Sequence, residues 1–212
     1  MNDTQLATRI RSIPAAIARY WNAKPLKLDI TDATCGQNIY EIVFDPQIVL
    51  AASGARLRGV HYNVEIVNVP MQPAPNPLGP LITGRRVLQG QSYVLGYRAV
   101  FNIGESRSGT DSVSASSRNP QADILEAHEY GHMLGLKDEY NDARFNRGGV
   151  DYELPDGTVQ RASGQEHLMD TMRVEQESRQ ARYATTIAYA VQDILNRNGR
   201  RVSRNRIIGD YI

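Results

Sequence analysis

The 212-residue chain has one cysteine, Cys35, so an intramolecular disulfide is impossible. This excludes the disulfide framework that many small secreted enzymes depend on. The chain also lacks an apolar run near the roughly 18 residues that a membrane-spanning helix needs. Its first ten residues lack the apolar core of a secretory signal. We therefore expect a soluble protein, either cytoplasmic or exported by a route that is independent of such a signal.

An excess of charge of one sign is lacking too, because 24 basic and 23 acidic residues leave a formal net charge of +1. A balance of this kind gives no support for attraction of the whole surface to nucleic acid or to a membrane. Lysine is scarce, since only Lys24, Lys27 and Lys137 occur, and we attribute the preference for arginine to compositional habit. Residues 200–206 are basic but contain no aromatic side chain that could stack on bases. We expect them to form a loose tail, and we expect no nucleic-acid or membrane partner.

What is present is the composition of an ordinary globular protein, with 41% hydrophobic residues. The length suits a single domain over residues 1–212, and the pattern predicts an α+β fold with a sheet-rich part at 1–118. Apolar residues from Leu6 to Tyr20 recur every three or four positions, which predicts a helix. Pro14 interrupts this pattern, so we expect a kink or two short helices there. Strand-like stretches follow at 26–30, 39–44, 60–69, 81–88 and 93–103.

The remaining part, residues 119–212, is predicted to carry two helices and a hairpin. Asn119 as N-cap and Pro120 at the first helical position mark the start of one helix. Residues 150–154 and 158–161 alternate around a Pro-Asp-Gly turn, as in a β-hairpin. Alanine and leucine at helical spacing predict a last helix from residue 181, with Asn198-Gly199 as its stop.

Residues 128–138 read H-E-Y-G-H-M-L-G-L-K-D, which is the pattern H-E-x-x-H-x-x-G-x-x-D. Residues four apart on a helix lie on the same face, so His128 and His132 can aim both imidazoles at one point. Glu129 lies about a quarter-turn away, where its carboxylate can reach a metal-bound water. The spacing therefore predicts two metal ligands and a base on one helix.

Gly135 tolerates the positive φ that ends a helix and turns the chain back. That turn would return Asp138 as a third ligand and leave a fourth position open. Two imidazoles, one oxygen ligand and an open position suit a catalytic zinc ion. An alternative keeps Asp138 at the surface and completes the site with His167 or Glu166.

With this motif between a strand-rich half and a final helix, the chain resembles the metzincin clan of zinc endopeptidases. The closest pattern is the snapalysin-like variant, in which aspartate replaces the third histidine. The resemblance covers residues 119–173 specifically and the rest only by the order of elements. It implies a zincin fold with a twisted mixed sheet, a backing helix, an active-site helix and a C-terminal helix.

The resemblance also implies the roles of individual residues. Zinc (Zn²⁺) would be held by His128, His132 and Asp138, with Glu129 as the general base. A tight turn beneath the metal would carry Met169, with Met172 as the alternative.

The expected activity is therefore hydrolysis of peptide bonds in protein or peptide substrates by a zinc-dependent endopeptidase. Tyr140 is a candidate for stabilising the oxyanion, whereas Tyr130 faces away from the zinc on a helical wheel. Two alternatives stay open: a zinc-binding module without catalytic activity, and an effector or toxin protease exported without a signal. An intact Glu129 favours an enzyme over a module that only binds, because metal binding alone requires no base.

Overall fold

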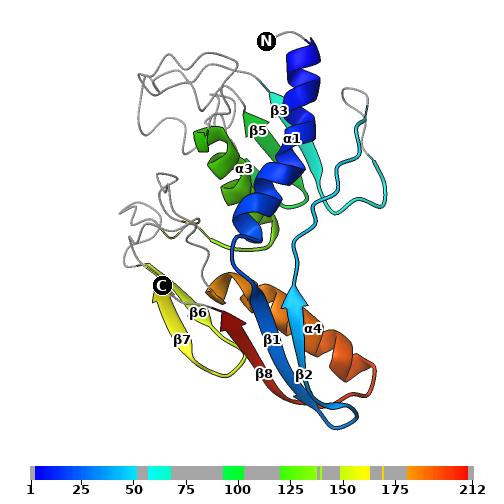
Figure 1. The fold of residues 1–212 in the computed structure, drawn as a ribbon, viewed down its shortest axis with the longest axis vertical. Helices are drawn as coiled ribbons and strands as arrows, with labels where there is room; N and C mark the ends of the chain where they lie inside the picture. The colour runs from blue at the N-terminus through cyan, green and yellow to red at the C-terminus, as the bar shows by residue number, and fades with distance from the viewer. Residues whose placement is uncertain are drawn as a thin grey trace. The chain divides into compact units, whose positions relative to one another are not determined.

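The computed structural model describes residues 3–51, 57–67, 93–102, 120–137, 139, 149–162, 169 and 181–209. These residues form an α+β structure of helices and several small sheets (Figure 1). The chain divides into two compact units. Unit 1 comprises Met1–Ile17 and Gln47–Met133, and unit 2 comprises Ala18–Pro46 and Leu134–Ile212.

The N-terminal segment is one helix, α1 (Asp3–Trp21), with Pro14 inside it. The alternative of two short helices is therefore wrong. A proline inside a helix costs about 3 kcal/mol. Ile13, Ile17 and Trp21 recur every four residues on α1 and are all buried. Burying three such side chains stabilises by about 1.5–3 kcal/mol each, which outweighs that cost.

Unit 1 contains a mixed sheet built from β3 (Asn63–Val67), β5 (Arg98–Asn102) and β4 (Tyr93–Leu95) in that order. β3 pairs with β5 in parallel, and β4 pairs with β5 antiparallel. The single strand expected at 93–103 is thus two strands in its described part. Gly96 has a φ of 59°, and this left-handed backbone begins the turn between them.

The motif helix of unit 1 is α3 (Pro120–Met133), which starts at the predicted proline. The strand expected at 81–88 lies outside the described residues.

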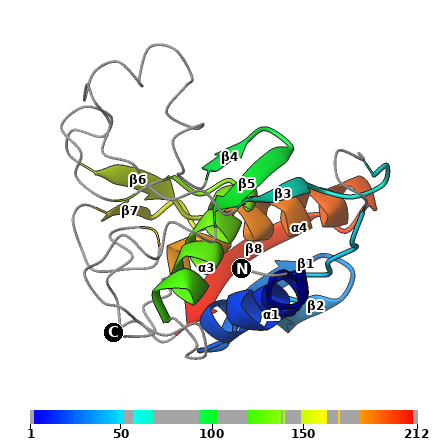
Figure 2. The same ribbon diagram turned by 90° about the horizontal axis from the view of Figure 1, so that it is seen from above.

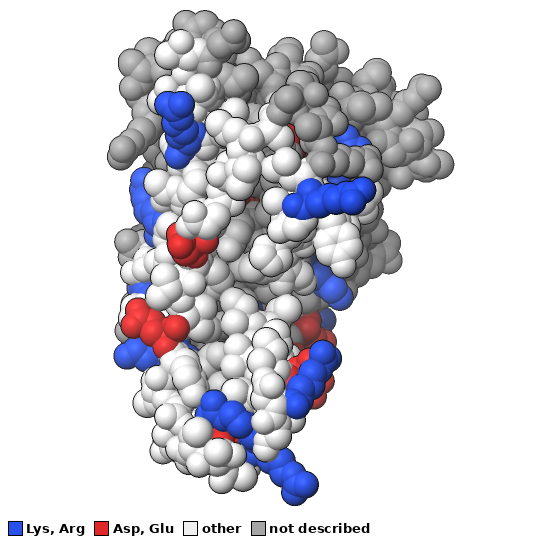
Figure 3. Space-filling view, turned by 90° about the vertical axis from the view of Figure 1, so that its right-hand side faces the viewer, with Lys and Arg blue, Asp and Glu red and all other residues white. Residues whose placement is uncertain are grey.

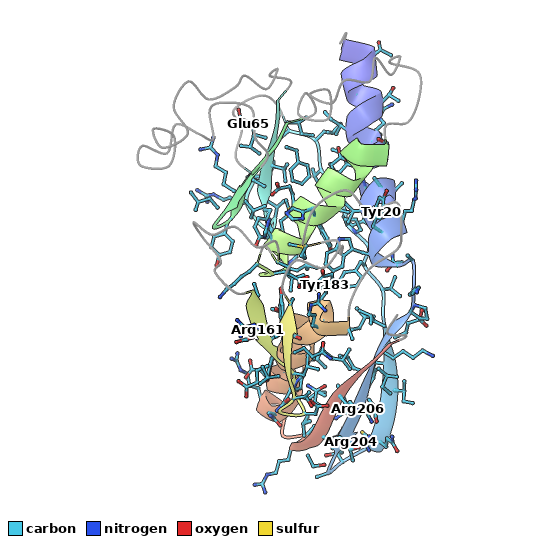
Figure 4. The ribbon with its side chains drawn as sticks, turned by 90° about the vertical axis from the view of Figure 1, so that its left-hand side faces the viewer. Tyr20, Glu65, Arg161, Tyr183, Arg204 and Arg206 are labelled. Atoms are coloured by element: carbon cyan, nitrogen blue, oxygen red, sulfur yellow. The ribbon has the colours of Figure 1, made fainter. Side chains whose placement is uncertain are left out.

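Unit 2 contains an antiparallel sheet with the order β2-β1-β8. β1 (Leu26–Asp32) is its central strand and β2 (Gly36–Ile42) is one edge. The other edge is β8 (Val202–Gly209), so the prediction of a loose tail at 200–206 is wrong. Buried Asn205 and Ile207 alternate with exposed arginines along β8. The prediction considered only the basic residues and overlooked this alternation. Figure 4 labels two of them, Arg204 and Arg206, on β8.

The core of unit 2 lies between this sheet and the last helix. The short 3-10 helix η3 (Ala181–Ala184) leads directly into α4 (Thr185–Arg197), which lies beside β8 (Figure 2). Small alanines on η3 and α4 pack against larger side chains of the sheet; the buried members are Leu26, Leu28, Ile30, Leu154, Ala181, Ala184, Ala188 and Ile207. Gly199 has a φ of 78° and follows α4, as predicted for its stop.

The predicted hairpin is confirmed as β6 (Val150–Glu153) and β7 (Val159–Ala162), which pair antiparallel in unit 2. The resemblance implies one twisted mixed sheet; the described strands form three sheets, of which β3-β5-β4 is mixed, and the zincin-specific arrangement stays a prediction. Basic and acidic side chains are interspersed on the face seen in Figure 3, in keeping with the balanced net charge. Within the described residues, no helix is both long and apolar enough to cross a bilayer.

Candidate metal centre

The end of α3 has the geometry that the motif predicts. The helix ends at Met133, and Gly135 follows with a φ of 86°, the left-handed conformation that reverses the chain. Tyr62 stabilises this end, because its hydroxyl donates a 2.7 Å hydrogen bond to the carbonyl oxygen of Met133. Burial, together with the nearby Tyr97, raises the pKa of Tyr62, so the hydroxyl keeps its proton. Sequence reasoning missed Tyr62, whose partner is 71 residues away.

His128 and His132 lie together on α3, as their spacing predicts. Their ring centroids are 4.8 Å apart, and the rings meet edge to face at 88°. His128 is only 4% exposed and His132 is half-buried. Two neighbouring imidazoles on a rigid helix fit the histidine part of a zinc site.

The same turn of α3 buries two carboxylates, Glu129 (5% exposed) and Glu126 (3% exposed). Taking a carboxylate out of water costs several kcal/mol unless the protein offers it interactions. Both residues make interactions within the protein. Of the two, Glu129 directly follows His128 in the motif and is the candidate for acid–base chemistry. Sequence reasoning identified Glu129 but overlooked Glu126, although an acid two positions before His128 was a visible signal.

The proposed third ligand, Asp138, lies outside the described residues. Of the residues that are described, no three histidine, cysteine, aspartate or glutamate side chains gather as a metal site. The ligand set His128, His132 and Asp138 therefore stays a prediction. Also outside the described residues are the alternatives His167, Glu166, Tyr140 and Met172.

Glu139, the residue directly after Asp138, is buried in unit 2 at 1% exposure. Arg182 donates two hydrogen bonds to it, from Nε to Oε1 at 2.8 Å and from Nη2 to Oε2 at 2.7 Å. The Tyr183 hydroxyl donates a third to Oε2 at 2.9 Å. A carboxylate held by three such bonds is not available as a metal ligand, so Asp138 is the better candidate of this acidic pair.

Met169 is fully buried beside Glu139 in unit 2. Its carbonyl oxygen accepts the backbone N–H of Glu139 at 2.7 Å. Its own N–H donates to the Tyr183 hydroxyl at 3.2 Å. Burial, and next the negative charge of Glu139, raise the pKa of Tyr183 well above its usual range, so Tyr183 stays neutral. The buried position suits the predicted methionine turn, whose contact with a metal stays a prediction.

Burial disfavours the charge of Arg182, but its hydrogen bonds to Glu139 and the negative charge of Glu139 together outweigh this and raise the pKa of the guanidinium. Sequence reasoning missed Glu139, Arg182 and Tyr183. The one available signal was the carboxylate pair at 138 and 139, which does not reveal which acid turns inward.

The structure thus brings together His128 and His132, with Glu129 beside them on α3, in unit 1. In unit 2 it brings together Glu139 and Met169. A search of protein-family models, curated proteins and solved structures found no match to this chain.

Proposed function

We propose that the chain is a zinc-dependent endopeptidase that hydrolyses peptide bonds in protein or peptide substrates. The observation that supports this most is the pair of adjacent imidazoles, His128 and His132, on a helix that also carries the buried Glu129. The left-handed Gly135 that ends the segment is the second support. A metzincin-like zincin fold is part of the proposal, within the α+β architecture.

In this proposal His128, His132 and Asp138 hold the zinc ion. The bound ion would supply Lewis acidity toward the substrate carbonyl and toward the attacking water. Met169 would lie in the turn beneath the metal.

Glu129 supplies the acid–base chemistry. One carboxylate oxygen accepts a proton from the attacking water, and the protonated acid then gives this proton to the leaving amine. Its buried position keeps bulk water from competing for the proton. Nothing in a site that only binds zinc would require an acid at this position.

The test is Glu129→Gln in the full-length, zinc-loaded protein, assayed on casein and on a peptide library. Removal of the general base should lower kcat by about 10²–10⁴-fold. Zinc content, measured by mass spectrometry, should stay at the wild-type level because glutamine leaves the ligands intact. Glu126→Gln is the matched control, since it makes the same change at another buried acid of α3.

Glu126→Gln should retain far more activity than Glu129→Gln. Cleavage by Glu129→Gln at the wild-type rate would contradict the proposed chemistry. A wild-type protein that binds zinc but cleaves no substrate would favour the non-catalytic module.

A further inference from the structure

A closed ring of hydrogen bonds in unit 2 ties Glu139 to Met169. The Glu139 backbone N–H donates to the Met169 carbonyl, and the Met169 N–H donates to the Tyr183 hydroxyl. The Tyr183 hydroxyl completes the ring by donating to Glu139 Oε2. Glu139 is thereby held at its main chain and at its side chain.

The ion pair between Glu139, a member of this ring, and Arg182 is almost fully buried. The side chain of Glu139 is 1% exposed and that of Arg182 is 6% exposed, and their two hydrogen bonds are bidentate. A buried ion pair adds little net stability compared with apolar residues of the same size, and in some proteins it selects one arrangement of the chain over others. We therefore expect the Glu139–Arg182 pair to contribute more to the position of the backbone than to the free energy of unfolding.

The partners of Glu139 belong to a rigid part of unit 2. All four residues of η3, including Arg182 and Tyr183, are buried, and η3 continues directly into α4. The Tyr183 ring packs 6.0 Å from Trp21, and the Arg182 guanidinium lies 5.8 Å from the centre of the Tyr152 ring. Tyr183, on η3, is labelled in Figure 4. The network is thus supported by the core.

We propose that Arg182 and Tyr183, through their bonds to Glu139 and Met169, are positioning residues that hold the residue after Asp138, and Met169 itself, in place for metal binding. The inference rests on the proposed function, in which Asp138 is a zinc ligand. The Cα atoms of neighbouring residues are 3.8 Å apart, so fixing Glu139 restricts where Asp138 can lie. Groups that hydrogen-bond directly to a metal ligand commonly change metal affinity 10–100-fold when they are lost, and we expect an effect of that order from restraint of the adjacent residue.

The experiment uses the full-length protein with Glu139→Gln and Tyr183→Phe. Zinc affinity is measured by competition with a chromophoric chelator, and ligand geometry by the visible spectrum of the cobalt-substituted protein. Thermal unfolding of the zinc-free protein reports stability separately. Asp32→Asn is the matched control, because Asp32 is another buried carboxylate of unit 2 that is paired with an arginine, Arg200.

Both variants at the network should weaken zinc binding by about 10–100-fold and alter the cobalt spectrum. Asp32→Asn should lower the unfolding temperature and leave zinc affinity and spectrum unchanged. If Glu139→Gln fails to fold, Tyr183→Phe decides, since it removes one hydroxyl and keeps the Glu139–Arg182 pair.

Wild-type zinc affinity and spectrum in a folded network variant would overturn the inference while leaving the proposed function intact. An equal loss of affinity in Asp32→Asn would overturn it too, because the effect would then reflect general destabilisation. A wild-type protein that binds no zinc would refute the proposed function, and the inference with it.

Discussion

Buried carboxylates in the described part of unit 2 are each paired with an arginine. The pairs are Asp29–Arg204, Asp32–Arg200 and Glu139–Arg182. The planar guanidinium can donate two parallel hydrogen bonds to a carboxylate, which a lysine ammonium cannot do. Some of the arginine preference in the sequence therefore has a structural use that composition alone did not reveal.

The clearest pH-dependent prediction at the residue scale concerns Asp32. Hydrogen bonding from Arg200 and from the backbone N–H of Cys35, with a further bond from Thr34, holds the pKa of Asp32 below its usual value. The ionised form is thus favoured in the folded state. Its stabilising effect is present above the unfolded carboxyl pKa of about 4 and is lost as the pH falls through the lower folded pKa.

Wild-type stability should therefore decline as the pH falls below about 4, and Asp32→Asn should lose this part of the decline. Asparagine keeps an oxygen for the turn hydrogen bonds from Thr34 and Cys35, and it removes the ionisable oxygen that accepts from Arg200. Urea unfolding across this pH range is the measurement, with Arg200→Gln as a second variant that should flatten the same region. Three superimposable pH profiles would contradict the assignment.

Part of the candidate site could be predicted from single residues and part could not. The adjacency of His128 and His132 follows from helix geometry, which local sequence encodes. The inward turn of Glu139 depends on Arg182 and Tyr183, more than 40 residues further along the chain. No local rule distinguishes Asp138 from Glu139 in advance.

Element boundaries were predictable at several positions where glycine or proline controls the backbone. Pro120 begins α3, Gly157 lies in the turn of the β6–β7 hairpin and Gly199 follows α4, as expected. The errors arose where tertiary packing decides. Burial of its apolar side chains keeps α1 continuous through Pro14. Local helix propensity alone predicts a break there, because it counts the cost of the proline but not the burial.

Gly135→Ala tests the end of the motif helix at the scale of the element. Among the described residues, an added Cβ would meet only Thr186 side-chain atoms at 3.9 Å, so no steric clash with them is expected. The cost should be backbone strain at a φ of 86°, about 1–2 kcal/mol in the free energy of unfolding. Chemical denaturation measures this loss.

Gly135→Asn is the control, because asparagine accepts the left-handed conformation more readily than alanine. It should be more stable than Gly135→Ala. An alanine variant as stable as the wild type would contradict the left-handed turn.

At the scale of the whole molecule, the closing strand of unit 2 comes from the far end of the chain. β8 pairs with β1 across about 180 residues of sequence, with Ile207 opposite Leu28. Such pairing is fixed by the core that both strands share, which local sequence does not specify. For this reason the sequence-based prediction for residues 200–206 was a loose tail and not a strand.

Ile207→Ala should lower the free energy of unfolding by about 2–5 kcal/mol, because it leaves a cavity in the core beneath α4. Its neighbour Ile208, 39% exposed, supplies the matched control. Ile208→Ala should change stability by about 0.5 kcal/mol or less. Equal small effects in both variants, measured by urea denaturation, would mean that β8 does not belong to the core.

The most direct test of the account is the location of zinc in crystals of the full-length protein, from anomalous diffraction at the zinc edge. We predict one strong peak about 2 Å from a ring nitrogen of His128, a ring nitrogen of His132 and a carboxylate oxygen of Asp138. Zinc bound elsewhere on the chain, with both imidazoles lacking metal in zinc-loaded crystals, would contradict the proposed site.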